Sequence, residues 1–247
     1  CGYTGGLRKI DPNGATKKLA FFRSRQKFDC TGLVHEGVFY VGAEDGFVYA
    51  ISLDGNKGKN QWDHLADQGK TDWFINSAPA LLGHAAIIIA GRDEHLHAFD
   101  LKCNVAWKMK IPGQMLAAPV IDGNGNIYVG ISVTKRGQAG HGRLVCIDPA
   151  NKRVAWEYRA DGPVESTPVI GNDSVIYFGD NTGTIHAVEK TGKGAWTRSV
   201  GSAVRSAGNI ASPKRVLFGL DDGTLVALAC TSESLADKGW PKYMGLS

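Results

Sequence analysis

Five of the six tryptophans in this chain end copies of one recurring phrase. Each copy opens with a short alternating segment, such as Gly46-Phe-Val-Tyr-Ala50, and reaches its tryptophan nine to thirteen residues later. These tryptophans are spaced 45, 49, 40 and 44 residues apart, and they are Trp62, Trp107, Trp156, Trp196 and Trp240. A fixed period of about 20 to 50 residues predicts a repeat architecture, either a solenoid or a propeller.

Each repeat unit divides into four short β segments. The first is a small-residue, proline and apolar phrase such as Ser166-Thr-Pro-Val-Ile170, and the second is an apolar run ending in glycine such as Val175-Ile-Tyr-Phe-Gly179. A tight Asp/Asn-Gly turn leads to the third segment, which alternates large and small residues, and the fourth ends on tryptophan. Four antiparallel strands that repeat radially predict a β-propeller, in which neighbouring blades bury both faces of each sheet.

The repeat also sets the number of blades. Residues 5–19 match the third and fourth strands of the later units, with Leu19 in the tryptophan position, and five complete units follow. The predicted fold is therefore an all-β propeller of four-stranded antiparallel blades, with five complete blades and a partial sixth. Because the repeat region 5–240 fills nearly the whole chain, we expect a single domain over residues 1–247.

Charge and hydropathy exclude some partners. No apolar run approaches 18 residues, so we expect no membrane-spanning segment. The formal net charge is only +4, but residues 1–30 hold seven basic and two acidic side chains. Such a patch can attract an anionic partner. A solvated outer strand explains it more simply, and we expect no nucleic-acid partner.

Cys1 is a candidate site of lipidation. The sequence begins Cys1-Gly2, which resembles the start of a mature bacterial lipoprotein, and a lipid there would be the only expected contact with a membrane. Against this, the repeat resumes by Gly5 and leaves little tether. The other four cysteines show no metal-ligand spacing, and an odd total of five defines no complete disulfide framework.

One phrase points to a known family. The segment Cys146-Ile-Asp-Pro-Ala-Asn-Lys-Arg-Val-Ala-Trp156 resembles the tryptophan-docking motif of the pyrroloquinoline-quinone (PQQ) propeller family, and Ala187 to Trp196 is a shorter version. That family contains quinoprotein dehydrogenases, which bind PQQ with calcium, and non-catalytic members such as the lipoprotein of the outer-membrane barrel-assembly machinery (the BamB type). The chain has no Cys-Cys pair and no recognisable Glu, Asn and Asp constellation of the dehydrogenases. The resemblance is therefore nearer to the BamB type, and it implies no catalytic, cofactor or metal residue.

Some acidic and histidine side chains could serve as metal ligands. His95 and His97 are two apart on one strand face, a spacing that two ligands could use, but His97 and His186 take the repeat position that Tyr49 fills elsewhere. Turn chemistry explains the Asp and Asn residues at each second-to-third-strand turn, which are Asp45, Asp93, Asp180, Asn181, Asp221 and Asp222. We expect no metal site and no catalysis.

Two irregular loops are the candidate interface. Residues 131–141 enlarge one second-to-third-strand turn and carry Lys135, Arg136 and His141, and the long connection after Trp62 carries Trp73. In a propeller both kinds of loop emerge on one face, and loops on a rigid scaffold tend to carry function. Alternatively, Trp73 covers a blade edge.

The sequence favours a non-catalytic scaffold that binds a protein partner through this face or an open blade edge. We expect a periplasmic or extracellular location, with outer-membrane anchoring if Cys1 is lipidated. Two alternatives stay open. One is a PQQ-dependent oxidoreductase or PQQ-binding remnant, with PQQ and calcium as cofactors; the other is a ligand-sensing ectodomain of a larger protein.

Overall fold

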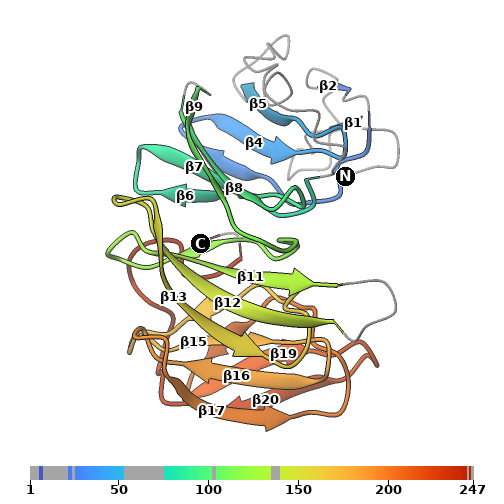
Figure 1. The fold of residues 1–247 in the computed structure, drawn as a ribbon, viewed down its shortest axis with the longest axis vertical. Helices are drawn as coiled ribbons and strands as arrows, with labels where there is room; N and C mark the ends of the chain where they lie inside the picture. Colours follow the sequence, from blue (N-terminus) through green and yellow to red (C-terminus); the bar gives the residue numbers. More distant parts are fainter. Residues whose placement is uncertain are drawn as a thin grey trace, which may run out of the picture.

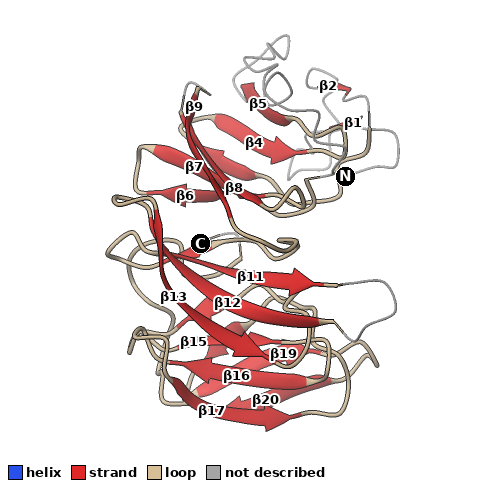
Figure 2. Ribbon diagram, viewed as in Figure 1, coloured by secondary structure: helices blue, strands red, loops and turns tan. Residues whose placement is uncertain are grey.

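The computed structural model describes residues 6–7, 22–23, 26–52, 75–101, 104–134, 140–243 and 245. All regular structure in these residues is β-strand, as Figure 2 shows. The strands form six antiparallel sheets, each with its strands in chain order. No helix in the described part of the chain is long and apolar enough to cross a membrane.

Five of the sheets are blades, numbered here in chain order (Figure 1). A two-stranded sheet of β1 (Gly6–Leu7) and β2 (Phe22–Arg23) precedes them. Blade 1 contains β3 (Leu33–His35), β4 (Val38–Gly42) and β5 (Val48–Ser52). Blade 2 contains β6 (Ala80–Leu82), β7 (Ala86–Ala90), β8 (His95–Asp100) and β9 (Val105–Lys110). Blade 3 contains β10 (Val120–Ile121), β11 (Ile127–Val133), β12 (His141–Asp148) and β13 (Arg153–Ala160). Blade 4 contains β14 (Val169–Ile170), β15 (Ile176–Gly179), β16 (Thr184–Val188) and β17 (Gly194–Ser199). Blade 5 contains β18 (Asn209–Ala211), β19 (Arg215–Gly219) and β20 (Leu225–Ala229).

The all-β propeller predicted from the repeat is confirmed, with five blades and a two-stranded sixth sheet. In blade 1 the described residues supply three strands, because the expected fourth strand before Trp62 lies outside them. In the two-stranded sheet Leu7 pairs with Phe22, while the predicted tryptophan-position residue Leu19 also lies outside the described residues.

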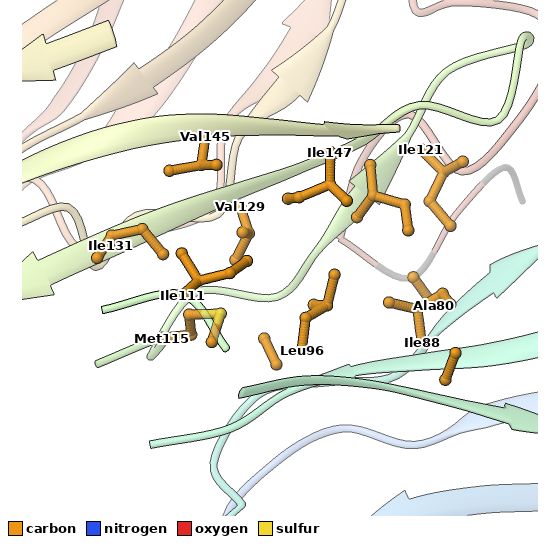
Figure 3. Packing of buried hydrophobic residues seen from close by; sticks show 13 residues of the cluster. Ala80, Ile88, Leu96, Ile111, Met115, Ile121, Val129, Ile131, Val145 and Ile147 are labelled. Carbon is orange, nitrogen blue, oxygen red and sulfur yellow. The ribbon is translucent and has the colours of Figure 1, made fainter. Parts of the chain in front are cut away.

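Apolar side chains of neighbouring blades fill the space between the sheets. Between blades 2 and 3, Leu96 and Ala98 of β8 pack with Val129 and Ile131 of β11, and all four are fully buried. Figure 3 shows the side chains of this cluster pointing toward one another from the two sheets. The large-and-small alternation seen in the sequence therefore interlocks the blades, and burial of each large side chain contributes roughly 2 kcal/mol.

Glycine ends several second strands because the next blade packs directly on it. A Cβ added to Gly179 would lie 2.3 Å from Cβ of Val204, and one added to Gly42 would lie 2.2 Å from Cγ2 of Ile75. Such separations are far below van der Waals contact, so a larger residue would push the blades apart. The glycine at this point of the repeat is a packing requirement.

The tryptophans of blades 2 to 4 lie at equivalent places on the fourth strands. Trp107, Trp156 and Trp196 pair with the small third-strand residues Ala98, Cys146 and Ala187, and the strand register shifts directly after each pair. The indole Nε1 of Trp156 also donates to the carbonyl oxygen of Lys190 in the next blade, at 2.9 Å.

Gly192 of that next blade lies directly beneath the Trp156 ring. Its φ is +86°, and an added Cβ would approach the ring to 2.8 Å. Only glycine combines this backbone conformation with this closeness. Trp156 therefore links its own blade to the third-to-fourth-strand turn of the following one.

Trp240 does not take the predicted fourth-strand position in blade 5. Its backbone instead pairs with Ile121 of β10, and the two residues exchange hydrogen bonds of 2.7 and 2.8 Å. The interpretation of this tryptophan as the fifth repeat anchor is wrong. The spacing from Trp196 fits the repeat, but the backbone of β10 offers this segment hydrogen-bond partners in another blade.

We call residues 231–243 the crossing segment, because they run from blade 5 to three other blades. They bond to Ile170 and Asn172 of blade 4, while Trp240 packs between the apolar clusters of blades 1 to 3. The hydroxyl of Tyr243 then bonds to that of Thr31 at the start of blade 1. The crossing segment thus joins the first strands of blades that are distant in sequence.

Candidate functional site

One face of the propeller, here called the loop face, is formed by the second-to-third-strand turns and the blade-to-blade connections. Hydrogen bonds join the two kinds of loop. Asn181 N donates to Pro163 O at 3.0 Å, Val204 N to Asp180 O at 3.0 Å, and Ile111 N to Glu94 O at 2.7 Å. The two kinds of loop therefore do emerge on one side, as the repeat predicts.

Five equivalent positions line the start of the blades on this face, and we call them the mouth positions. Each immediately precedes the small or sulfur-bearing residue that opens a first-strand phrase, and they are Asp29, Asn76, Leu116, Glu165 and Arg205. Four of the five carry polar or charged side chains. Asn76 Nδ2 donates to Asp29 Oδ2 at 3.4 Å, which links blades 1 and 2 in the same way that Arg205 links blades 5 and 4.

Arg205 is the centre of an exposed polar network on the described part of the loop face. Its Nε lies 3.1 Å from Glu165 Oε2, and another guanidinium nitrogen contacts Asp221. Asn181 donates to the second oxygen of Glu165 at 2.9 Å. The Arg205 side chain is 49% exposed, so each ion pair adds little to stability, and the network presents both signs of charge to a partner.

The sequence did not reveal the mouth positions. Glu165 and Arg205 share one place in the repeat, directly after Val164 and Val204, but the first-strand phrase begins only at the next residue. Extending that alignment by one residue would have shown a polar or charged position within an otherwise small and apolar phrase.

The turn aspartates hold their blades together from within. In three blades the turn carboxylate accepts a hydrogen bond from the aromatic residue just before the small third-strand residue. Asp45 accepts from the hydroxyl of Tyr49 at 2.6 Å. Asp93 and Asp180 accept from the Nε2 atoms of His97 and His186, both at 3.0 Å. Asp45, Asp93 and Asp180 also accept backbone N–H groups of their own turns. These histidines and aspartates therefore have structural partners.

Asp180 is the most deeply placed of these acids. Its side chain is fully buried, and burial alone would raise its pKa. Hydrogen bonds from His186, Thr182 and the backbone of Thr184 outweigh that effect and lower the pKa of Asp180 to about 2. The pair of Asp180 and His186 thus stabilises the turn and the third strand of blade 4 together.

Within the described residues, no group of three or more His, Cys, Asp or Glu side chains is arranged to hold a metal ion. Burial raises the pKa of the thiols of both Cys30 and Cys146 to about 12. A thiol in this state is a poor nucleophile. Cys146 packs among the apolar side chains between blades 3 and 4.

Of the candidate interface residues, the structure describes His141. It is exposed at the first position of β12, on the loop face, opposite Val133. Trp73, Lys135, Arg136 and the candidate lipidation site Cys1 lie outside the described residues, as does Trp62. Their roles stay predictions.

The repeated blade, with tryptophan paired to a small third-strand residue, defines a propeller of the PQQ-like repeat class. A family model described as "Outer membrane protein assembly factor BamB" matches residues 92–236, which is more than half of the chain. The chain therefore belongs to this BamB family.

A solved structure supports the same fold. The crystal structure of BamB from Moraxella catarrhalis superposes with a TM-score of 0.69 at 13% sequence identity, covering 92% of this chain and 67% of that one. At this identity the likeness establishes the fold alone. No curated protein matches the chain in sequence.

Proposed function

We propose that the chain is a non-catalytic scaffold that binds a protein partner during outer-membrane assembly in the bacterial envelope. The observation that carries the proposal is the family match over residues 92–236, whose description names an outer membrane protein assembly factor. The aspartates and histidines of the repeat are engaged in structural bonds, as expected of a scaffold.

The loop face is the proposed partner surface. It carries the exposed network of Glu165, Arg205 and Asp221, and His141 lies on the same face. Mixed exposed charge of this kind steers association and sets orientation more than it adds affinity. The candidates Trp73, Lys135 and Arg136 belong to loops of this face by the repeat pattern and would supply the aromatic and basic anchors that interfaces favour.

Co-purification tests this proposal. The tagged chain, expressed in its own bacterium, is isolated from solubilised envelopes, and we expect the outer-membrane barrel-assembly machinery to accompany it. Combined replacement of Trp73, Lys135 and Arg136 by alanine should reduce recovery of the machinery at least about tenfold, since such anchors dominate interfaces. Recovery of the machinery that is equal for this variant and the unchanged chain would contradict the loop-face assignment.

A matched control removes charge from the opposite face. Lys190 and Lys193 flank the third-to-fourth-strand turn of blade 4, are exposed, and should tolerate alanine without loss of the partner.

A titration of the purified chain with PQQ and calcium tests the proposal that the chain works without a cofactor. We expect no saturable binding and no dye reduction, and saturable binding with dye reduction would overturn it in favour of an oxidoreductase.

A further inference from the structure

Among the described residues, blade 5 ends in a strand with one unpaired edge. β20 pairs with β19 on one side, and no strand of the described residues pairs with its other edge. In blades 2 to 4 the equivalent third strand pairs with a fourth strand. The crossing segment directly follows β20, but its bonds go to blades 4, 3 and 1.

The uncovered strand also exposes an apolar face. Leu225 is 70% exposed, whereas the residues at the same place in blades 2, 3 and 4 are fully buried. Ala227 is exposed as well, although its equivalents Ala98 and Ala187 have no exposed surface. Val226 and Leu228 face the other way, toward blade 4. Leu225 and Ala227 therefore lie on the opposite face, where a side chain on an added fourth strand would lie beside them.

We infer that β20 accepts an extended segment of a partner protein as the fourth strand of blade 5. Backbone groups of the free edge would supply the hydrogen bonds, as in other cases of strand addition. The inference deepens the proposed scaffold function by naming a site and a class of partner, and it rests on that function only for its biological role.

The repeat defines which side chains the segment should carry. A tryptophan stands opposite the small third-strand residue in blades 2, 3 and 4, so an aromatic residue should lie opposite Ala227. Its ring would cover Ala227 and Leu225, because directly opposed residues of two strands share a face.

The charge of the neighbouring turn favours a basic residue after the aromatic one. In blade 4 the tryptophan is followed two residues later by Arg198, which lies opposite Ile185 near the second-to-third-strand turn. The corresponding turn of blade 5 holds the exposed carboxylates Asp221 and Asp222. The partner segment is therefore an extended strand with an aromatic residue and a cation two or three positions later.

A peptide derived from this chain provides the test. Residues 193–200, Lys-Gly-Ala-Trp-Thr-Arg-Ser-Val, reproduce the fourth strand of blade 4, and fluorescently labelled peptide is titrated into the purified full chain. We expect saturable one-to-one binding with a Kd below about 1 mM. Replacing the peptide tryptophan by alanine should weaken binding about thirtyfold, as expected for an aromatic anchor. Absence of saturable binding would overturn the inference.

Two variants locate the site. Leu225→Arg places a charge on the free face of β20 and should weaken peptide binding at least about tenfold, without unfolding a protein in which this side chain is mostly exposed. Val105→Arg is the matched control, because Val105 is 51% exposed on β9, which already is a fourth strand. Equal affinity of the Leu225 variant and the unchanged chain would refute the β20 site.

Hydrogen exchange and sedimentation show whether the β20 edge is instead covered by another part of this chain or by a second copy of it. We expect the β20 amides that point away from β19 to exchange fast in the free chain and to gain protection with peptide. Strong protection in a free monomer would show that another part of this chain covers the edge. A dimer that the Leu225→Arg change abolishes would show that a second copy does so, and either result would overturn the inference. These measurements use no envelope component. Their outcome is therefore independent of the co-purification experiment that tests the proposed function.

Discussion

Blades 4 and 5 follow the same repeat pattern, but their third strands have opposite environments. Both have a glycine-ended second strand, an acidic turn and a third strand that alternates large and small residues. Blade 4 has a fourth strand and a neighbour on each face, so Ile185 and Ala187 are fully buried. In blade 5 the third strand is followed by the crossing segment and not by a described fourth strand, and Leu225 and Ala227 are exposed. A repeat residue is therefore a core residue only where the next element is present.

The largest expected effect is a difference in stability between matched variants of blades 4 and 5. Ile185→Asp would bury an unpaired carboxylate in the cluster between blades 4 and 5, and it should lower the free energy of unfolding by about 4 kcal/mol or more. Leu225→Asp is its matched control in blade 5 and should change that free energy by less than about 0.5 kcal/mol. Urea denaturation of both variants checks the difference, and similar losses would mean that the face of β20 is covered in solution.

Tryptophan replacement gives the next largest effect. Trp156→Ala removes a ring that packs on Gly192 and donates a hydrogen bond to the following blade, and it should cost about 3 kcal/mol. Trp196→Ala should cost about half as much. Trp196 packs beside Tyr177, but blade 5 has no third-to-fourth-strand turn among the described residues to receive the indole. Thermal unfolding of the two variants measures the difference, and a larger loss for Trp196 would contradict this account.

Acid titration gives the smallest of the three effects. The pKa of Asp180 falls from an ordinary 3.8 to about 2 in the folded chain. Because the folded-state pKa is lowered, its stabilising contribution is fully present above about pH 4 and is lost as the pH falls toward 2. That contribution is about 2 kcal/mol. Unfolding measured from pH 5 to 2 should show this loss in the unchanged chain.

Asp180→Asn should remove that part of the pH dependence. Asp222→Asn is the matched control, since Asp222 is an exposed turn residue of blade 5 that accepts one backbone hydrogen bond, from Thr224. The control variant should keep the acid dependence of the unchanged chain. Unaltered acid dependence in the Asp180 variant would show that other groups carry it.

The strands of the blades could be predicted from the sequence, because the residue patterns that form them are local and recur in each repeat. Alternation predicts the third strands, and the glycine that ends the second strand reports contact with the next blade. The same reasoning failed for Trp240, whose spacing fits the repeat. Its backbone partner is Ile121, about 120 residues earlier in the chain, and no periodic pattern records such a pairing.

The candidate site was predicted less well than the fold. The loop face followed from strand topology, and His141 lies on it, but the network around Arg205 was not anticipated. Its members come from two connections and two turns that meet only after the blades have packed. The repeat position of His97 and His186 was recognised, whereas their hydrogen bonds to turn aspartates depend on side-chain geometry that the sequence does not display.

The crossing segment has a consequence for the order of folding during synthesis. Its bonds tie blade 4 and blade 3 to residues 234–241, and Thr31 of blade 1 to Tyr243. Each blade can stack on its predecessor as it leaves the ribosome, because its contacts are with neighbours in sequence. The inner edges of blades 3 and 4 stay unpaired with this segment until residues 234–241 have been translated. A ribosome stalled before that point should therefore hold a stack of blades that is more open to proteolysis than the finished chain.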